Sequence, residues 1–195
     1  PPASGPRKSD ARAWAAGGLP KGSGVLPVPD VRETDDVVAI AVSDLHLSHT
    51  PPACRSEEKD WYGCMERQLR QLREIQMNHS TNPYLPVPLL VAGDVFDKWN
   101  PPVELVTFAL KNLPDCIAVP GQHDLPHHAL ADMHRSAYGL LVQAGRIRHV
   151  EESHSQYPLM IHGFPWGEEV TPLNDAPPAV HVALIHAYVW KPGAS

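Results

Sequence analysis

The stretch VVAIAVSDLHL, residues 37–47, joins an apolar run rich in β-branched side chains to a short polar cluster. A continuous apolar run of this kind is typical of a strand buried on both faces, as in the middle of a layered α/β sheet. We therefore expect a strand over residues 37–42. Asp44 and His46 follow at its C-terminal end, two positions apart, where side chains of an extended chain point to the same side.

The same succession of apolar strand and polar cluster recurs three more times. Strands are expected over residues 89–92, 116–119 and 180–186, and they lead to GDVFD (93–97), GQHD (121–124) and His186. In α/β sheets, ligands bind at the C-terminal ends of the strands. The four clusters therefore predict one site in which carboxylate, imidazole and amide groups meet.

Helical patterns separate these strands. Residues 56–79 predict a helix capped by Ser56, because apolar side chains recur at spacings of three and four at Trp61, Met65, Leu69, Leu72 and Ile75. Asn100, followed by two prolines in the first turn, predicts a second helix that Asn100 caps and that runs to about residue 113. We expect a third helix over residues 128–144 and short strands over residues 147–150 and 157–162. This alternation predicts a layered α/β fold with a largely parallel sheet.

The composition of the chain limits its domain extent, its possible partners and its cellular compartment. Residues 1–36 are rich in Pro, Gly and Ala and predict a disordered arm, which leaves residues 37–195 as one domain. No apolar run reaches the roughly 18–20 residues that cross a bilayer, so we expect no membrane association. The net charge of −6 argues against a chain-wide basic surface for nucleic acid, although bound metals add positive charge that residue counts miss. Three cysteines without a C-x-x-C pair predict free thiols in a reducing compartment, the cytoplasm.

The polar clusters carry groups that suit divalent cations. Asp94 has two carboxylate oxygens and can bridge two ions, while the Gln122 amide oxygen is a neutral, hard ligand. His123 can act as a general acid or face a phosphate as a cation, with Asp124 expected to hold its ring. Each cluster alone is also explained by a polar turn or a backbone-bonded histidine, so the ordered set is what indicates a metal site.

In order, the motifs D-x-H, G-D-x-x-D, G-Q-H-D and H resemble the calcineurin-like metallophosphoesterase superfamily over roughly residues 37–190. The forms SDLHL and GDVFD look most like the SbcD-like DNA-repair exonuclease branch, and GQHDLPHH is similar to phage-type members of that branch. The resemblance implies an αββα sandwich with mixed sheets and two divalent ions. It also implies that Asp44 and His46 bind the first ion, Asp94 bridges both, His186 binds the second, and His123 protonates or stabilises the leaving oxygen.

Two positions depart from the family pattern. Gln122 stands where the family has an asparagine ligand of the second ion, and its side chain is one methylene longer. The histidines of the family's last motif, G-H-x-H, have no counterpart before the final residues KPGAS. We interpret this as a domain whose C-terminal part is missing; the other reading is a degenerate, inactive member.

The leading functional hypothesis is metal-dependent hydrolysis of phosphodiester bonds, with DNA as substrate, by an exonuclease or endonuclease of DNA repair or recombination. Manganese is the first expectation for the metal, because a set of oxygen and nitrogen ligands without cysteine suits harder ions. Iron and zinc stay open. Arg55 and Asp97 are expected to contact the substrate, and the resemblance implies a coiled-coil ATPase partner. Two alternatives remain: a phosphomonoesterase or protein phosphatase with the same site, and a metal-binding remnant without catalysis.

Overall fold

The structure is a computed structural model of the 195-residue chain, and it describes residues 37–80, 86–156, 159–172 and 180–188. The arm expected over residues 1–36 lies outside the described residues. Within the described part, no helix combines the length and apolarity that crossing a bilayer requires.

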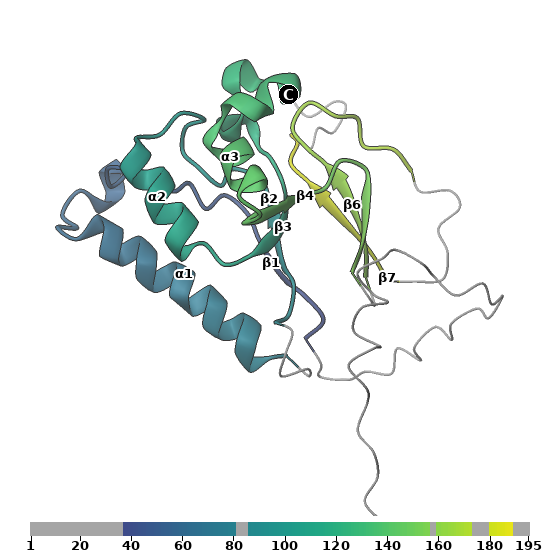
Figure 1. The fold of residues 1–195 in the computed structure, drawn as a ribbon, viewed down its shortest axis with the longest axis horizontal. Helices are drawn as coiled ribbons and strands as arrows, with labels where there is room; N and C mark the ends of the chain where they lie inside the picture. The colour runs from purple at the N-terminus through teal and green to yellow at the C-terminus, as the bar shows by residue number, and fades with distance from the viewer. Residues whose placement is uncertain (1–36, 81–85, 157–158, 173–179, 189–195) are drawn as a thin grey trace, which may run out of the picture.

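Four parallel strands form the first sheet, in the order β1-β2-β3-β4 (Figure 1). Two of them, β2 (Leu89–Ala92) and β3 (Cys116–Val119), have the bounds that the sequence predicts. The other two are β1 (Ile40–Val42), which begins three residues later than expected, and β4 (Ile147–His149). The predicted α/β fold with a parallel sheet is confirmed.

The second sheet is mixed and has three strands in the order β5-β6-β7. Strand β5 (Ser153–Gln156) runs antiparallel to β6 (Leu159–Phe164), which runs parallel to β7 (Val180–Ile185). The sequence did not predict β5, because SHSQ carries no apolar alternation. Strand β6 extends two residues beyond the expected range of 157–162, whose first two positions lie outside the described residues.

Two hydrophobic clusters cover the two faces of the first sheet. Leu89 and Val91 of β2 face the helices, and Leu90 packs with Leu159 and Ile161 of the second sheet. Since successive side chains of a strand point to opposite faces, a strand buried on both sides must be apolar throughout. This double burial explains the continuous apolar runs in the sequence.

Three α-helices accompany the first sheet: α1 (Trp61–Asn78), α2 (Val103–Asn112) and α3 (Ala137–Gln143). Figure 1 shows them on the side of that sheet away from β6 and β7. Among the described residues, no helix covers the outer side of the second sheet. The described chain therefore contains three of the four layers that an αββα sandwich has.

Both expected helix caps are wrong. Residues 53–55 form a 3-10 turn that Ser56 closes, and α1 is capped instead by Asp60, whose carboxylate accepts a hydrogen bond from the Gly63 amide at 2.9 Å. Helix α2 begins beyond Asn100 because Pro101 precedes Pro102, and a residue that precedes a proline favours extended rather than helical backbone. Its N-cap is Pro102, which offers no side-chain acceptor.

The helix expected over residues 128–144 is broken into three pieces. Two 3-10 helices, Pro126–His128 and Leu130–Arg135, precede α3. His127 and His128 have φ angles of 52° and 58°, which an α-helix cannot contain. Ser136 then caps α3 by accepting the Gly139 amide at 3.0 Å.

Candidate metal centre

Backbone hydrogen bonds extend the pairing of β1 and β2 beyond the ends of both strands. Asp44 donates to the carbonyl of Gly93 at 3.1 Å, His46 to that of Asp94 at 3.0 Å, and Leu47 to that of Val95 at 2.9 Å. The D-x-H and G-D-x-x-D motifs therefore lie side by side at the C-terminal edge of the first sheet.

The backbone at this edge is not the extended chain that the D-x-H spacing suggested. Asp44, His46 and Asp94 have φ angles of 54°, 44° and 51°, in the left-handed region that non-glycine residues rarely adopt. Such conformations cost roughly 1–3 kcal/mol each and persist where the surroundings impose them, often at functional sites. The Asp44 and His46 side chains still meet, with Oδ1 and Nε2 3.7 Å apart.

Asp94 lies at the centre of the cluster and is 1% exposed. Its Oδ1 accepts the backbone amide of His123 at 3.0 Å. Its Oδ2 lies 3.7 Å from Nε2 of His46 and 3.5 Å from Nε2 of His186. Burial acts to raise the pKa of Asp94, but hydrogen bonds from His186 and His123 outweigh it and lower the pKa below the ordinary value.

His186, which follows β7, crosses to the first sheet and is oriented there. Its Nδ1 lies 2.7 Å from the carbonyl of Ala92. A carbonyl only accepts, so Nδ1 carries the proton and the neutral ring presents its Nε2 lone pair to the cluster, as metal-binding histidines commonly do. Without a metal, the hydrogen bond with Asp94 raises the pKa of His186 to about 9.

The side chain of Gln122 also reaches His186, although the family has the shorter asparagine at this position. Its Oε1 lies 2.8 Å from Nε2 of His186. The additional methylene therefore does not carry the amide away from the cluster, and the amide oxygen faces the same space as His186 and Asp94.

Two glycines allow the loops to come this close. A Cβ on Gly93, where φ is 86°, would collide with the ring of His186, and a Cβ on Gly121 would collide with Asp94. Glycine is thus required at both positions by close approach, and at Gly93 also by the backbone angle.

A second group of ligand-type side chains adjoins the first. His46, Asp97 and His123 bring one ligand atom each within 4.8 Å of one another. Nδ1 of His46 lies 3.8 Å from Oδ1 of Asp97, and the rings of His46 and His123 are in edge contact. The sequence placed Asp97 with the substrate contacts; the structure places its carboxylate beside the two histidines.

Asp124 does not hold the ring of His123, contrary to expectation. It is fully buried, and its carboxylate accepts the backbone amides of Val95, Phe96 and Gly121 at 3.1, 2.9 and 3.0 Å. The ring of His123 is instead oriented by its Nδ1, which donates to the carbonyl of Asp97 at 3.0 Å. Burial raises the pKa of Asp124 to about 6 against the lowering effect of these amides.

Arg55, the other expected substrate contact, is held against α1. Its guanidinium donates to Sγ of Cys64 at 3.1 Å, lies 3.7 Å from the carboxylate of Glu58, and lies 6.0 Å from the ring of Trp61. Trp166, which sequence analysis did not assign to the site, contacts His186 edge-on at 6.2 Å between ring centroids. In the sequence, the position of Trp166 in Gly-Phe-Pro-Trp-Gly, just after the end of β6, is the feature that could have indicated a place near the site.

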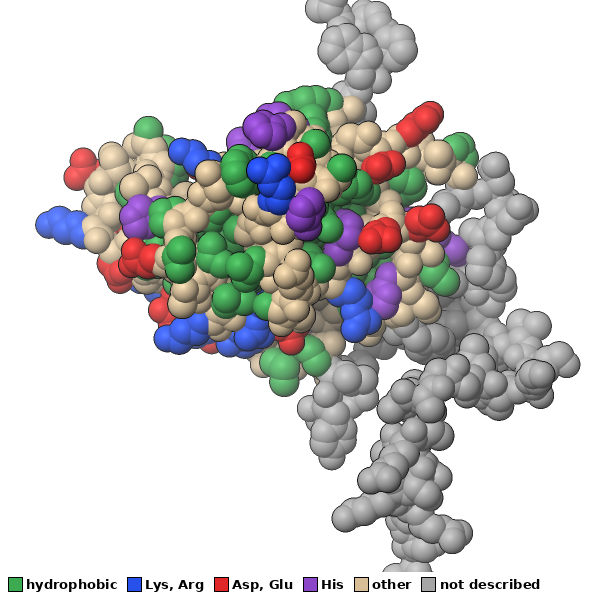
Figure 2. Space-filling model, turned by 45° about the horizontal axis from the view of Figure 1, so that its top comes forward, with side chains coloured by type: hydrophobic (Ala, Val, Ile, Leu, Met, Phe, Trp, Pro, Cys, Tyr) green, Lys and Arg blue, Asp and Glu red, His purple; other side chains and the backbone are tan. Residues whose placement is uncertain are grey.

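The residues present fit divalent metal ions. Asp44, Asp94 and His186 form one group of three ligand atoms within 4.8 Å, with no cysteine among them. Atoms that bind one ion at about 2.1 Å lie at most about 4.2 Å apart, and the 3.5–3.7 Å separations around Asp94 meet that limit. Among the described residues, Nδ1 of His46 is buried and has no hydrogen-bond partner, which is costly without an ion or water. On the face that Figure 2 shows, histidine and acidic side chains lie at the surface, with Lys and Arg side chains among them.

One comparison with known proteins agrees with this geometry, and it is the comparison with family models. Comparison with curated proteins gave no match. A family model for calcineurin-like phosphoesterase matches residues 38–187, which span the four motifs and both sheets. The chain therefore belongs to the calcineurin-like phosphoesterase family, which implies a metal-dependent hydrolase of phosphoric esters.

Proposed function

We propose that the chain hydrolyses phosphodiester bonds, with DNA as its substrate, at a centre of two divalent ions. The observation that carries the two-ion centre is the position of Asp94 Oδ2 near both Nε2 of His46 and Nε2 of His186, at 3.7 and 3.5 Å. One carboxylate oxygen that faces ligands from both sheets suits a bridge between two ions. Asp44 and His46 would complete the first ion's ligands, and Gln122 and His186 those of the second.

When bound, two ions would supply an activated water and neutralise charge that develops on the phosphoryl oxygens. The protein's own contribution is to orient the groups around that reaction. His123 donates through Nδ1 to Asp97, so its other ring nitrogen is left to face the substrate. As an imidazolium, that nitrogen can give a proton to the leaving oxygen.

DNA is proposed because SDLHL and GDVFD resemble the nuclease branch, and a coiled-coil ATPase partner rests on the same resemblance. Manganese is the proposed metal, because a set of carboxylate, amide and imidazole ligands without thiolate suits harder ions. A cytoplasmic location is proposed from the three free cysteines, Cys54, Cys64 and Cys116, since thiols stay reduced there.

A phosphomonoesterase or protein phosphatase is the second candidate function. The net charge of −6 favours it over a nuclease, because a chain without a basic surface attracts a polyanion weakly. Both functions would use the same ligands, so only the substrate distinguishes them.

The test compares three substrates in the presence of manganese: bis(p-nitrophenyl) phosphate, p-nitrophenyl phosphate and a DNA duplex with free ends. We expect the diester and the DNA to be hydrolysed faster than the monoester. Asp94→Asn should lower the rate by about a thousandfold or more, since it removes charge from both ion positions. Asp132→Asn, which alters only the surface pair with Arg135, is the matched control.

Metal content gives the second readout. The wild-type chain should retain manganese after dialysis, and Asp94→Asn should lose most of it. A preference for the monoester would establish the second candidate. If the chain neither hydrolysed any of the three substrates nor retained metal, both candidate functions would be rejected and the non-catalytic reading would remain.

A further inference from the structure

A hollow of about 300 Å³ lies beside the metal centre, between the chain that follows β1 and the helix α1. His46 and Asp97 line it at the metal centre, and Leu45, Trp61 and Leu72 are among its apolar walls. We call it the Trp61 pocket. A larger depression of about 700 Å³ runs along β4 to His154, but none of the candidate metal ligands lines it.

The chemistry of the walls indicates what the pocket can bind. Its lining contains no lysine or arginine, so an anionic group gains no charge partner inside it. Apolar walls with a few polar groups at one end are typical of small-molecule sites. The indole of Trp61 offers a flat apolar surface, and its N–H already donates to the Ser48 carbonyl at 2.8 Å. An uncharged planar group is therefore the complementary ligand.

The pocket is held in shape before any ligand enters. The Trp61–Ser48 hydrogen bond joins α1 to the loop, and the guanidinium of Arg55 lies 6.0 Å from the Trp61 ring while it donates to Cys64. Pro51 and Pro52 line the pocket with fixed φ angles. A preformed pocket lowers the ordering cost of binding.

We propose that the Trp61 pocket binds a planar aromatic group attached to the phosphate at the metal centre. This rests on the proposed function, because the metal centre must hold the phosphate. His46 connects the two regions, because it is among the residues that line the pocket and its Nε2 lies 3.7 Å from Oδ2 of Asp94. In DNA the aromatic group is the base of the nucleotide next to the scissile phosphate; in another ester it is an aryl substituent.

The experiment compares phenylphosphonate with methylphosphonate, neither of which can be hydrolysed, by isothermal titration of the manganese-loaded chain. Phenylphosphonate should bind about tenfold more tightly, because its ring buries apolar surface. It should also shift the Trp61 indole N–H signal in NMR spectra of the zinc-loaded chain, a signal assigned by its loss in Trp61→Phe. Thymidine 5′-monophosphate is the third probe: a shift with it identifies a nucleobase, and a shift with phenylphosphonate alone identifies an aryl ester.

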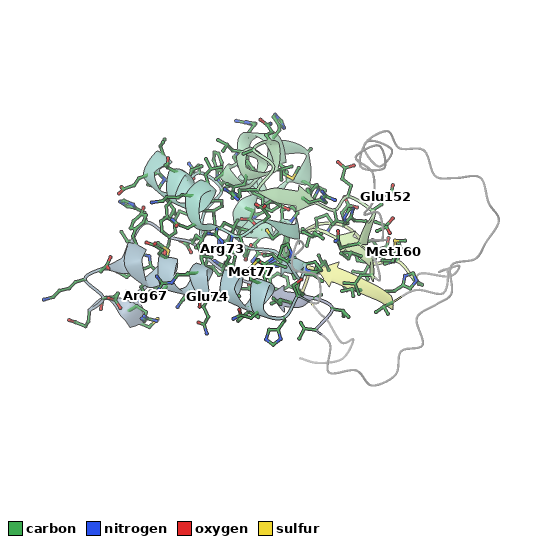
Figure 3. The ribbon with its side chains drawn as sticks, turned by 60° about the horizontal axis from the view of Figure 1, so that its bottom comes forward. Arg67, Arg73, Glu74, Met77, Glu152 and Met160 are labelled. Carbon is green, nitrogen blue, oxygen red and sulfur yellow. The ribbon has the colours of Figure 1, made fainter. Side chains whose placement is uncertain are left out.

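Two variants introduce a bulky side chain into the pocket lining, one on α1 and one in the chain after β1, without altering the core. Gln68 and Thr50 are exposed residues that line it, and Gln68→Trp and Thr50→Trp should each abolish the preference for phenylphosphonate. Arg67, labelled on α1 in Figure 3, is exposed and does not line the pocket, so Arg67→Trp is the matched control and should retain the preference.

The outcomes separate this inference from the proposed function. Equal affinity for the two phosphonates with an unmoved Trp61 signal overturns the pocket assignment even if diesters are hydrolysed. So does a preference that survives in both filling variants. A Trp61 shift with phenylphosphonate, lost in both variants, supports the pocket even if no ester is hydrolysed, which would reject only the proposed function.

Discussion

The two sheets contribute to the candidate metal centre in different ways. The first sheet supplies whole loops, in which Asp44, His46 and Asp94 are fixed by strand-like hydrogen bonds and left-handed backbone. The second sheet supplies one ligand candidate, His186, whose ring is held by the Ala92 carbonyl of the first sheet. The first sheet therefore holds its three side chains through its own backbone, while the contribution of the second sheet depends on how β7 packs against the first.

Among the variants that compare the two sheets, the largest effect is expected at His186, and it tests whether the second sheet acts through this residue alone. His186→Ala removes a ligand and should lower the kcat/KM for bis(p-nitrophenyl) phosphate by about 10²–10³-fold. His181→Ala is the control on the same strand: its ring lies 2.8 Å from His162 and belongs to neither ligand group. Steady-state kinetics in manganese would measure both, and equal losses would show that β7 matters for packing rather than for ligation.

The next effect tests the close approach of the sheets at Gly93. Gly93→Ala should lower the free energy of unfolding by about 2–4 kcal/mol, from about 1 kcal/mol for the backbone angle and the rest from the collision with His186. Gly167→Ala controls for the angle, since φ is 90° there and no atom would contact the added Cβ. Urea denaturation of both variants measures the difference, and equal losses would mean that His186 moves aside freely.

A third prediction concerns the frame of the first sheet. Asp124→Asn replaces one acceptor oxygen with a donor that faces backbone amides, and should lower the free energy of unfolding by about 2–3 kcal/mol. Asp115→Asn, which weakens the exposed pair with Arg146 at 2.7 Å, should cost less than about 1 kcal/mol. If chemical denaturation gave similar midpoints for the two variants, Asp124 would not fix these loops.

The smallest effect tests Gln122, where the two sheets meet. Gln122→Asn shortens the side chain whose Oε1 lies 2.8 Å from His186, and should weaken binding of the second manganese ion about tenfold. Isothermal titration should show one site unchanged and one weakened. Unchanged affinity at both sites would show that the amide does not bind metal.

Part of the fold and of the site could be predicted from local sequence. Strands β2 and β3 matched their expected bounds because burial on both faces demands unbroken apolar runs. The caps at Ser56 and Asn100 were wrong because each helix start depends on the backbone leading into it. Strand β5 was missed because its pairing with β6, rather than its own side chains, makes it a strand.

The sequence by itself determined the types and order of the candidate ligands, because strand ends of a parallel sheet bring such clusters to one edge. Only the tertiary structure decided which groups each residue contacts. Asp124 faces three backbone amides and Asp97 joins His46 and His123, and neither arrangement follows from spacing. Spacing fixes where a residue enters the site, whereas the packing of distant segments fixes which atoms it meets.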